Sequence, residues 1–295
     1  MHQETVIYYT LTMKTINAVL DSIYTEIAKK LDRRAKYNSL PCILFLDIDG
    51  TLSEFHPDPE QSFIPSSTLN NIAQIQQFLP LYLVTGRSIE QAQRLIQPYR
   101  WNIIGSHGIE LLQQDGIGQK LVYINHKELE QLKSSVLEQQ YKWQPIRVEI
   151  KTHSVALHFR EHPEYADQAK AIIDNYLKQF SSFELKSGKC VYELVPHGCN
   201  KGAAIQHILE DLEAEQFYPI FIGDDLTDEA GFHIINDYGG MSIKVGPGES
   251  AAKARLDDVA DVGFFLHEFL TSLKALKQEM KGEKTCPDSL YYPTV

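Results

Sequence analysis

The stretch that decides the fold covers residues 41–52 and reads PCILFLDIDGTL. Its four apolar residues at 43–46 are typical of a short buried strand. Asp47 and Asp49 stand at the end of that strand, and Gly50 can make the tight turn that leads away from the sheet. Unpaired carboxylates beside a core are costly, and open α/β sheets bind ligands at the carboxyl ends of their strands. The stretch therefore predicts a reaction centre that holds a divalent cation.

Composition limits the class of protein. The chain has 295 residues, of which 43% are apolar and 23% charged, and its net charge is -11. These values are ordinary for a globular protein and lack the electrostatic footprint of a nucleic-acid binder. Its 4 cysteines show no CxxC spacing, which favours a reducing compartment over a disulfide framework. With no signal-peptide pattern and no apolar run near the ~20 residues of a membrane span, we expect a cytoplasmic protein without nucleic-acid or membrane partners.

Two patterns along the chain predict two domains. Residues 41–114 read as strand, helix, strand, helix, strand, an order that builds a parallel sheet by right-handed crossovers. Residues 115–196 alternate helices with strand pairs, which indicates a separate inserted α+β domain. The first pattern resumes over residues 197–278 and completes the core domain. The predicted class is therefore α/β, with a parallel-sheet core and an inserted domain.

The two ends of the chain are predicted to lie outside these domains. Residues 1–40 form a helical extension whose apolar residues recur at helical spacing: Ile16, Val19, Leu20, Ile23, Ile27 and Leu31. Such a helix either packs on the body of the protein or makes a dimer contact. Residues 279–295 are polar and contain prolines, so they predict a loose tail. The oligomeric state stays open, with a monomer slightly favoured.

Three further polar segments fall at strand ends or helix starts. They are Thr85-Gly86-Arg87, Asn200-Lys201-Gly202, and the run from Asp224 and Asp225 to Asp228. Each alone has an ordinary explanation as an acidic turn, a helix cap or a solvated lysine. Together they would bring several carboxylates, a hydroxyl and a cation to one sheet edge. Hard oxygen ligands select Mg²⁺, which points to phosphoryl chemistry.

The residue types suggest a division of roles. Asp47 is the candidate nucleophile and would form an aspartyl-phosphate. Asp49 is placed to protonate the leaving oxygen and then to deprotonate the attacking water. Thr85 and the Gly86 backbone can donate hydrogen bonds to phosphoryl oxygens, and Lys201 would balance the charge between Asp47 and the phosphate.

Four motifs carry a family resemblance. DIDGT at 47–51, TGR at 85–87, Lys201 and GDDLTD at 223–228 resemble the motifs of haloacid-dehalogenase-like (HAD) phosphatases. More narrowly, GSHGIE at 105–110, NKG at 200–202 and GDDLTDE at 223–229 are similar to those of trehalose-6-phosphate phosphatases. The resemblance implies a Rossmann-like core with an α+β cap, and a cap that selects the sugar. It also implies Mg²⁺ held by Asp47, by the backbone carbonyl of Asp49 and by Asp224.

The resemblance further implies two groups of supporting residues. Substrate contacts are expected from both domains, at Gly86, Arg87, Ser106, His107, Glu149, Lys151, Lys189, Glu193 and Asn200. Help for the reacting groups is expected from Thr51, Asp225 and Asp228. The sequence departs from the family at two positions near these residues, since the family often has Ala at Ile109 and a basic residue at Val195.

The implied activity is hydrolysis of trehalose 6-phosphate, a small-molecule sugar phosphate, to trehalose and phosphate. One alternative is a HAD phosphatase for another sugar phosphate, such as sucrose phosphate or mannosyl-phosphoglycerate. Another is a non-catalytic protein that senses a sugar phosphate, although such a protein has no need to retain Asp47, Asp49, Lys201 and Asp224 together. A phospho-receiver domain shares the acidic cluster but not the inserted domain.

Overall fold

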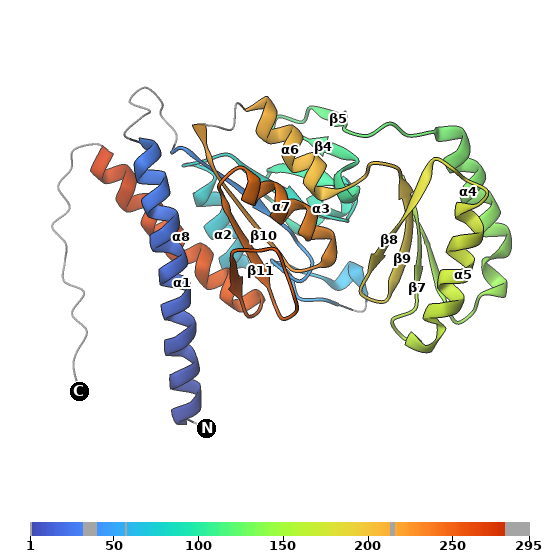
Figure 1. Ribbon diagram of the computed structural model, residues 1–295, viewed down its shortest axis with the longest axis horizontal. Coiled ribbons are helices and arrows are strands. Elements are labelled where there is room, and N and C mark those ends of the chain that lie inside the picture. Colours follow the sequence, from blue (N-terminus) through green and yellow to red (C-terminus); the bar gives the residue numbers. More distant parts are fainter. Residues whose placement is uncertain (1, 32–39, 57, 213–215, 281–295) are drawn as a thin grey trace.

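An eight-stranded sheet runs through the larger domain of the computed structural model, which describes residues 2–31, 40–56, 58–212 and 216–280 (Figure 1). Its strand order is β12-β11-β10-β1-β2-β3-β4-β5, with parallel pairing from β12 to β3 and antiparallel pairing beyond. β1 is thus a central strand. The strands are β1 (Cys42–Leu46), β2 (Leu81–Val84), β3 (Asn102–Gly105), β4 (Glu110–Leu112), β5 (Gly118–Lys120), β10 (Tyr218–Gly223), β11 (Met241–Val245) and β12 (Ala254–Leu256).

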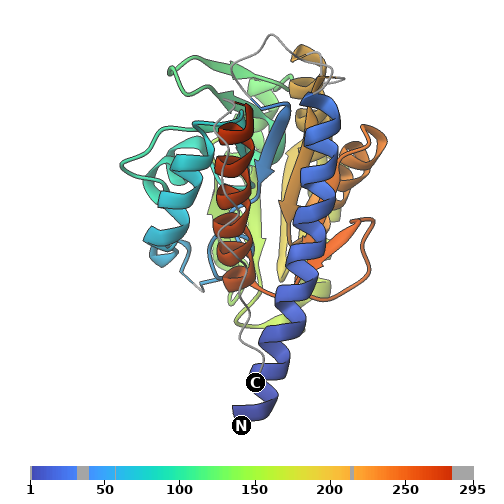
Figure 2. The same cartoon turned by 90° about the vertical axis from the view of Figure 1, so that its left-hand side faces the viewer.

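Side chains of β1 alternate between two apolar layers. Leu44 and Leu46 join the cluster beneath one set of helices, whereas Ile43 and Phe45 join the cluster on the opposite face. The first set comprises α1 (His2–Leu31), α2 (Ser66–Ile75), α3 (Ile89–Leu95) and α8 (Val259–Met280). The second comprises α6 (Lys201–Asp211) and α7 (Glu229–Asp237), and Figure 2 shows α1 and α8 lying side by side over the sheet. Because both faces are covered, the central strands are apolar throughout.

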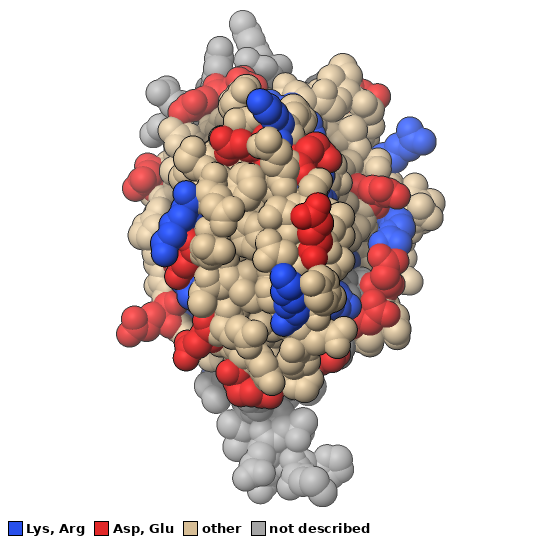
Figure 3. Space-filling view, turned by 90° about the vertical axis from the view of Figure 1, so that its right-hand side faces the viewer, with Lys and Arg blue, Asp and Glu red and all other residues tan. Residues whose placement is uncertain are grey.

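The cap is a four-stranded antiparallel sheet in the order β6-β7-β9-β8. Its apolar face packs on two helices, and in Figure 1 the sheet lies between those helices and the core. Figure 3 views the molecule from the cap end, where acidic and basic side chains are interspersed on the surface. The elements are α4 (His126–Gln139), β6 (Arg147–Ile150), β7 (Val155–His158), α5 (Ala166–Leu177), β8 (Phe183–Gly188) and β9 (Val191–Pro196). The predicted α/β class with an inserted α+β cap is confirmed.

The N-terminal helix packs on the body of the protein. Ile16, Leu20, Ile23 and Ile27 of α1 are buried in the same apolar cluster as α8. This agrees with the predicted amphipathic spacing, and a dimer contact stays a separate prediction. None of the described helices combines the length and apolar character that crossing a membrane requires.

Two segments differ from the sequence pattern. The hairpin of β4 and β5 extends the large sheet, so residues 118–120 pair with a core strand although the pattern assigns them to the inserted domain from residue 115. At the other end, α8 continues to Met280, so residues 279 and 280 are helical rather than part of a tail. Residues 281–295 of that predicted tail lie outside the described residues.

Candidate active site

A buried chain of charges begins at the end of β1. Lys201, the first residue of α6, donates to Asp47 Oδ1 at 2.8 Å and to Asp228 Oδ1 at 2.7 Å. All three side chains are almost fully shielded from solvent. Burial alone would lower the pKa of Lys201, but the carboxylates of Asp228 and Asp47 have the opposite and larger effect and raise the pKa above its ordinary value. Lys201 therefore remains an ammonium ion beside Asp47.

The carboxylates outnumber this cation. Oxygen atoms of Asp47, Asp224 and Asp228 lie within 4.8 Å of one another. Burial, followed by the charge of Asp228, raises the pKa of Asp47 well above its ordinary value. The same two causes raise the pKa of Asp224 to about 7. The cluster thus carries more negative charge than Lys201 offsets, and a further cation would stabilise it.

The donor atoms fit a divalent metal. Both oxygens of Asp228 are occupied, because Oδ1 binds Lys201 while Oδ2 accepts the N–H groups of Asp224 at 3.0 Å and Asp225 at 2.9 Å. In contrast, Asp224 Oδ1 is buried without a hydrogen-bond partner among the described residues, and so is Thr51 Oγ1. Asp47 and Asp224 are therefore the carboxylates left to bind a hard cation, while Asp228 holds the lysine and the turn.

Asp49 faces a guanidinium group. Arg87 donates from Nε to Asp49 Oδ2 at 2.7 Å and from Nη2 to Asp49 Oδ1 at 2.6 Å, and also to Ser62 Oγ at 2.8 Å. Thr85 is buried, and its Oγ1 accepts the N–H of Arg87 at 3.1 Å. Arg87, predicted to contact substrate, is thus bound to the predicted acid–base residue in this structure.

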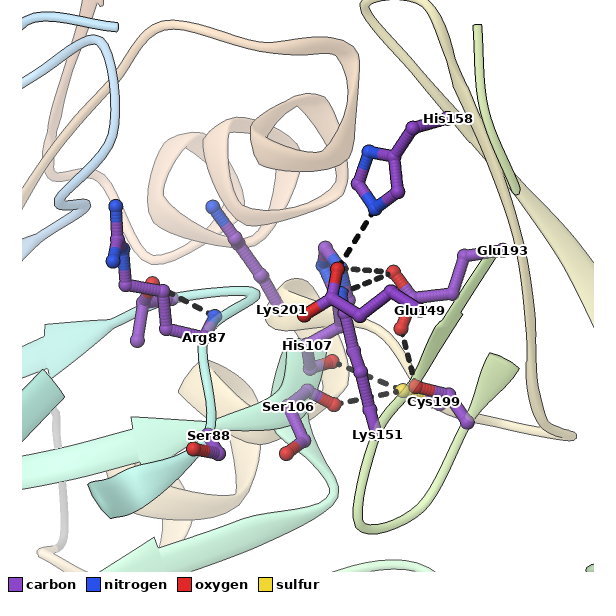
Figure 4. A network of polar contacts seen from close by, with 12 residues as sticks. Arg87, Ser88, Ser106, His107, Glu149, Lys151, His158, Glu193, Cys199 and Lys201 are labelled. Carbon is purple, nitrogen blue, oxygen red and sulfur yellow. Dashed lines mark hydrogen bonds and ion pairs between the residues drawn. The ribbon is translucent and has the colours of Figure 1, made fainter. Parts of the chain in front are cut away.

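The GSHG segment aims a histidine at the cap. Ser106 and His107 have φ values of 52° and 57° in the left-handed region. Their N–H groups donate to the carbonyls of Arg87 at 2.7 Å and Thr85 at 3.0 Å, and Cys199 Sγ donates to the carbonyls of Ser106 and His107. Figure 4 shows the imidazole of His107 pointing toward Glu193. The imidazole sits against Gly86, where an added Cβ would lie 2.4 Å from His107 Cε1.

Glu193 of β9 is held from both domains. Lys151 donates to its Oε2 at 2.8 Å, Ser154 donates to Oε1, and His107 Nε2 lies 3.5 Å from Oε2. Burial alone would raise the pKa of Glu193, but Lys151 and then His107 lower it well below its ordinary range. Glu193 therefore stays ionised and can accept hydrogen bonds from hydroxyl groups.

A second cap carboxylate lies on the same sheet face. Glu149 of β6 is 2.7 Å from His158 Nε2; burial alone would raise the pKa of Glu149, but His158 and Lys151 together outweigh it and lower the pKa. Glu149 pairs with Ala156, which in turn pairs with Glu193, so the two glutamates flank a small residue across three strands. A cavity of about 240 Å³ lies between this face and Asp47 and is lined by residues of both domains.

The cavity brings together most of the predicted site. Its lining includes Asp47, Asp49, Gly86, Arg87, His107, Glu149, Lys151, Lys189, Glu193, Lys201 and Asp225. Lys189 lies over the Phe55 ring, with 5.5 Å between Nζ and the centroid. Two predicted substrate contacts have other partners: Asn200 caps α6 by accepting the Ala203 N–H at 2.6 Å, and Ser106 Oγ donates to Glu110 at 3.3 Å.

Sequence reasoning missed several lining residues. His158 could have been found from the register of the β6–β7 hairpin. Arg147 pairs with His158, so Glu149, two residues further along β6, is the diagonal neighbour of His158 on the same face. Phe55 and Arg160 carry no comparable local signal. Their contact, with the Arg160 guanidinium carbon 5.5 Å from the Phe55 centroid, joins a loop of the core to the cap.

The fold and the acidic cluster at the strand ends define a haloacid-dehalogenase-like hydrolase with a cap. A solved haloacid dehalogenase-like hydrolase from Bacteroides thetaiotaomicron shares this fold with a TM-score of 0.57 at 14% identity, covering 80% of this chain and 99% of that one. The crystal structure of a trehalose-6-phosphate phosphatase related protein gives a TM-score of 0.64 at 28% identity, covering 82% and 100%.

Sequence comparison narrows the class. The trehalose-phosphatase family model matches residues 45–261, and the chain belongs to that family. A trehalose-6-phosphate phosphatase of Escherichia coli K12 is 31% identical over 241 residues, 81% of this chain and 90% of that protein. A probable trehalose-phosphate phosphatase of Sinorhizobium fredii is 33% identical over 214 residues, 72% and 80% of the two chains. The protein is therefore a phosphoric monoester hydrolase.

Proposed function

We propose that this enzyme is a Mg²⁺-dependent phosphatase that hydrolyses trehalose 6-phosphate to trehalose and phosphate through an aspartyl-phosphate on Asp47. The observation that carries the proposal is the shared cavity. One end holds Asp47 and Lys201, and the other holds the ionised glutamates of the cap, Glu149 and Glu193. A disaccharide phosphate has matching ends, since its phosphate needs cations and its hydroxyls need acceptors.

The two chemical steps use the core residues. The free oxygen of Asp47 attacks phosphorus, the bond from phosphorus to the sugar oxygen breaks, and Asp49 gives its proton to that oxygen. Water then attacks the phosphorus of the aspartyl-phosphate, Asp49 takes the proton of that water, and Asp47 leaves as a carboxylate. Arg87 must release Asp49 for this exchange, and the freed guanidinium can bind the phosphoryl oxygens.

Metal binding would complete the core end. Asp47, Asp224 and the backbone carbonyl of Asp49 are the proposed ligands, and bound Mg²⁺ would neutralise charge on the carboxylates and the phosphoryl group. Lys201 already offsets part of the negative charge near Asp47, because its ammonium group is 2.8 Å from Oδ1. Thr85 and the Gly86 N–H would donate to the phosphoryl oxygens, and Thr51, Asp225 and Asp228 would hold the surrounding turns.

The cap would select the sugar. Glu149 and Glu193 accept hydrogen bonds, whereas Lys151, Lys189 and His158 donate them, so the face offers both kinds of partner to sugar hydroxyls.

The domain bounds at 41–114, 115–196 and 197–278 and a slightly favoured monomer stay proposals. So does a cytoplasmic location, which the free thiols of Cys42, Cys190 and Cys199 support.

The test is phosphate release by the purified enzyme across a panel of sugar phosphates, with and without Mg²⁺. We expect the highest kcat/KM for trehalose 6-phosphate and turnover only with Mg²⁺. Preference for sucrose phosphate or mannosyl-phosphoglycerate would overturn the substrate and leave the chemistry standing. Binding of a sugar phosphate without turnover of any panel member would instead indicate a sensor.

A further inference from the structure

A polar cluster outside the cavity joins the core to the cap. It comprises Glu110 of β4, Lys120 of β5 and His153 of the turn between β6 and β7, and we call it the hairpin–turn cluster. Lys120 Nζ is 2.7 Å from Glu110 Oε2 and 2.6 Å from His153 Nε2. His153 Nε2 is also 3.3 Å from Glu110 Oε2, so each member contacts the other two.

The cluster is sheltered enough to hold its geometry. The side chain of His153 is 7% exposed and that of Glu110 17%, whereas Lys120 is 47% exposed. The contacts of Glu110 with His153 and Lys120 together outweigh burial and lower the pKa of Glu110 to about 2. Glu110 is therefore anionic at neutral pH, and a charged hydrogen bond fastens the cap turn to the core hairpin.

Both sides of the cluster lead directly to the sugar-binding end of the cavity. On the cap side, His153 lies between Lys151 and Ser154, and the Lys151 N–H donates to the Ser154 carbonyl at 3.0 Å across this turn. Those two residues are the cap's hydrogen-bond donors to Glu193. Any displacement of His153 would therefore displace both of them.

On the core side, Ser106 Oγ donates to Glu110 Oε1 at 3.3 Å. Ser106 precedes His107, the core residue that faces Glu193 at 3.5 Å. Glu110 thus supports the segment that aims His107, while His153 supports the turn that aims Lys151 and Ser154. The hairpin–turn cluster therefore links the segment that carries His107 to the turn between β6 and β7.

We propose that Glu110, Lys120 and His153 are positioning residues for sugar recognition. They fix the β6–β7 turn on the core hairpin so that Glu193 stands between Lys151 and His107. None of them lines the cavity, so they act through the turn and not on the substrate. The inference rests on the proposed function, because the substrate it concerns is a sugar phosphate that reaches the cap.

The test compares Lys120→Met with wild type on trehalose 6-phosphate and on p-nitrophenyl phosphate, which carries no sugar hydroxyls for the cap to bind. We expect KM for the sugar phosphate to rise about fivefold, while kcat/KM for the small ester stays within about twofold. Lys120→Arg keeps the charge and the donors, and should return KM toward the wild-type value. His153→Ala removes a buried partner and should give a larger increase with the same selectivity.

Lys170→Met is the matched control, since Lys170 is 42% exposed and pairs with Asp174 on α5, away from the cavity. Equal effects of Lys120→Met on both substrates, or an effect matched by Lys170→Met, would overturn the inference. If His153→Ala does not fold, the two Lys120 variants decide. If wild type prefers another sugar phosphate, the proposed substrate fails, and the same KM ratio measured on the preferred one still tests the cluster.

Discussion

Two buried groups of carboxylates face each other across one cavity, and their pKa values shift in opposite directions. In the core, burial raises the pKa of Asp47 and Asp224, and the neighbouring Asp228 raises it further. In the cap, burial acts on Glu193 in the same sense, but Lys151 and His107 outweigh it and lower the pKa. Desolvation is thus common to both groups, and the local balance of charge decides the sign.

The difference indicates what each end is built to receive. The core end has more negative than positive charge, and a bound cation can balance it. Protein interiors seldom leave such buried charge uncompensated. The cap end is already neutralised and hydrogen-bonded, so it can accept uncharged hydroxyl groups without rearranging its charges. This contrast supports the proposal of a metal-bound phosphate at one end and a sugar at the other.

The largest expected effect is at the core nucleophile. Asp47→Asn should lower turnover by about 10³-fold or more, because the amide cannot form the aspartyl-phosphate. Phosphate release measures the loss, and circular dichroism checks that the fold is retained. Asp115→Asn, at an exposed turn, is the control and should keep wild-type activity. Turnover near the wild-type rate in Asp47→Asn would overturn the assignment of the nucleophile.

Removal of the metal should rank second and affect only the core end. Chelation should abolish phosphate release, and returning Mg²⁺ should raise Tm because binding favours the folded state. Since burial and Asp228 raise the pKa of Asp224 to about 7, protons compete with the metal at low pH, and the rise should be larger at pH 8 than at pH 5. The same rise in Asp224→Asn as in wild type would contradict the proposed ligand.

A cap variant should separate recognition from chemistry. Glu193→Ala removes an acceptor for sugar hydroxyls and should raise KM for trehalose 6-phosphate by about 10- to 100-fold. The kcat for p-nitrophenyl phosphate should change little. Glu184→Ala, also on the cap sheet but outside the cavity lining, is the control. Comparable losses on both substrates would mean that Glu193 supports the fold and not recognition.

The smallest effect is expected at the seam between the two regions. The pKa of Glu110 is lowered from 4.5 to about 2 in the folded protein, so its stabilisation is present above pH 4.5 and lost as the pH falls toward 2. Between pH 5 and pH 3, the free energy of unfolding should fall in both proteins. The fall should be about 1 kcal/mol smaller in Glu110→Gln than in wild type, allowing for solvent screening. Urea unfolding measures this, with Glu138→Gln as the control. The same fall between pH 5 and pH 3 in Glu110→Gln as in wild type would show that Glu110 is not held as an anion.

Local pattern was sufficient for much of the core. The apolar run at 43–46 predicted β1, and the polar residues at the strand ends predicted the meeting of Asp47, Lys201, Asp224 and Asp228, because parallel strands deliver their carboxyl ends to one edge. The predicted end of the core at residue 114 stays a proposal, although β5 lies beyond it in the large sheet. Only the pairing of β4 with β3 decides that β5 joins the large sheet, because a short polar strand such as residues 118–120 does not show to which domain its hairpin belongs.

The sequence by itself determined the class of fold, the order of its elements and the place of the acidic motifs, since these depend on periodicity and on residues a few positions apart. Only the tertiary structure decided that Arg87 binds Asp49, that Lys120 and His153 meet, and that the glutamates of the cap are stabilised as anions while the core aspartates are not. The physical reason is that charge–charge energies depend on distances of a few ångströms between segments far apart in the chain. Folding sets those distances, and the residue types alone do not.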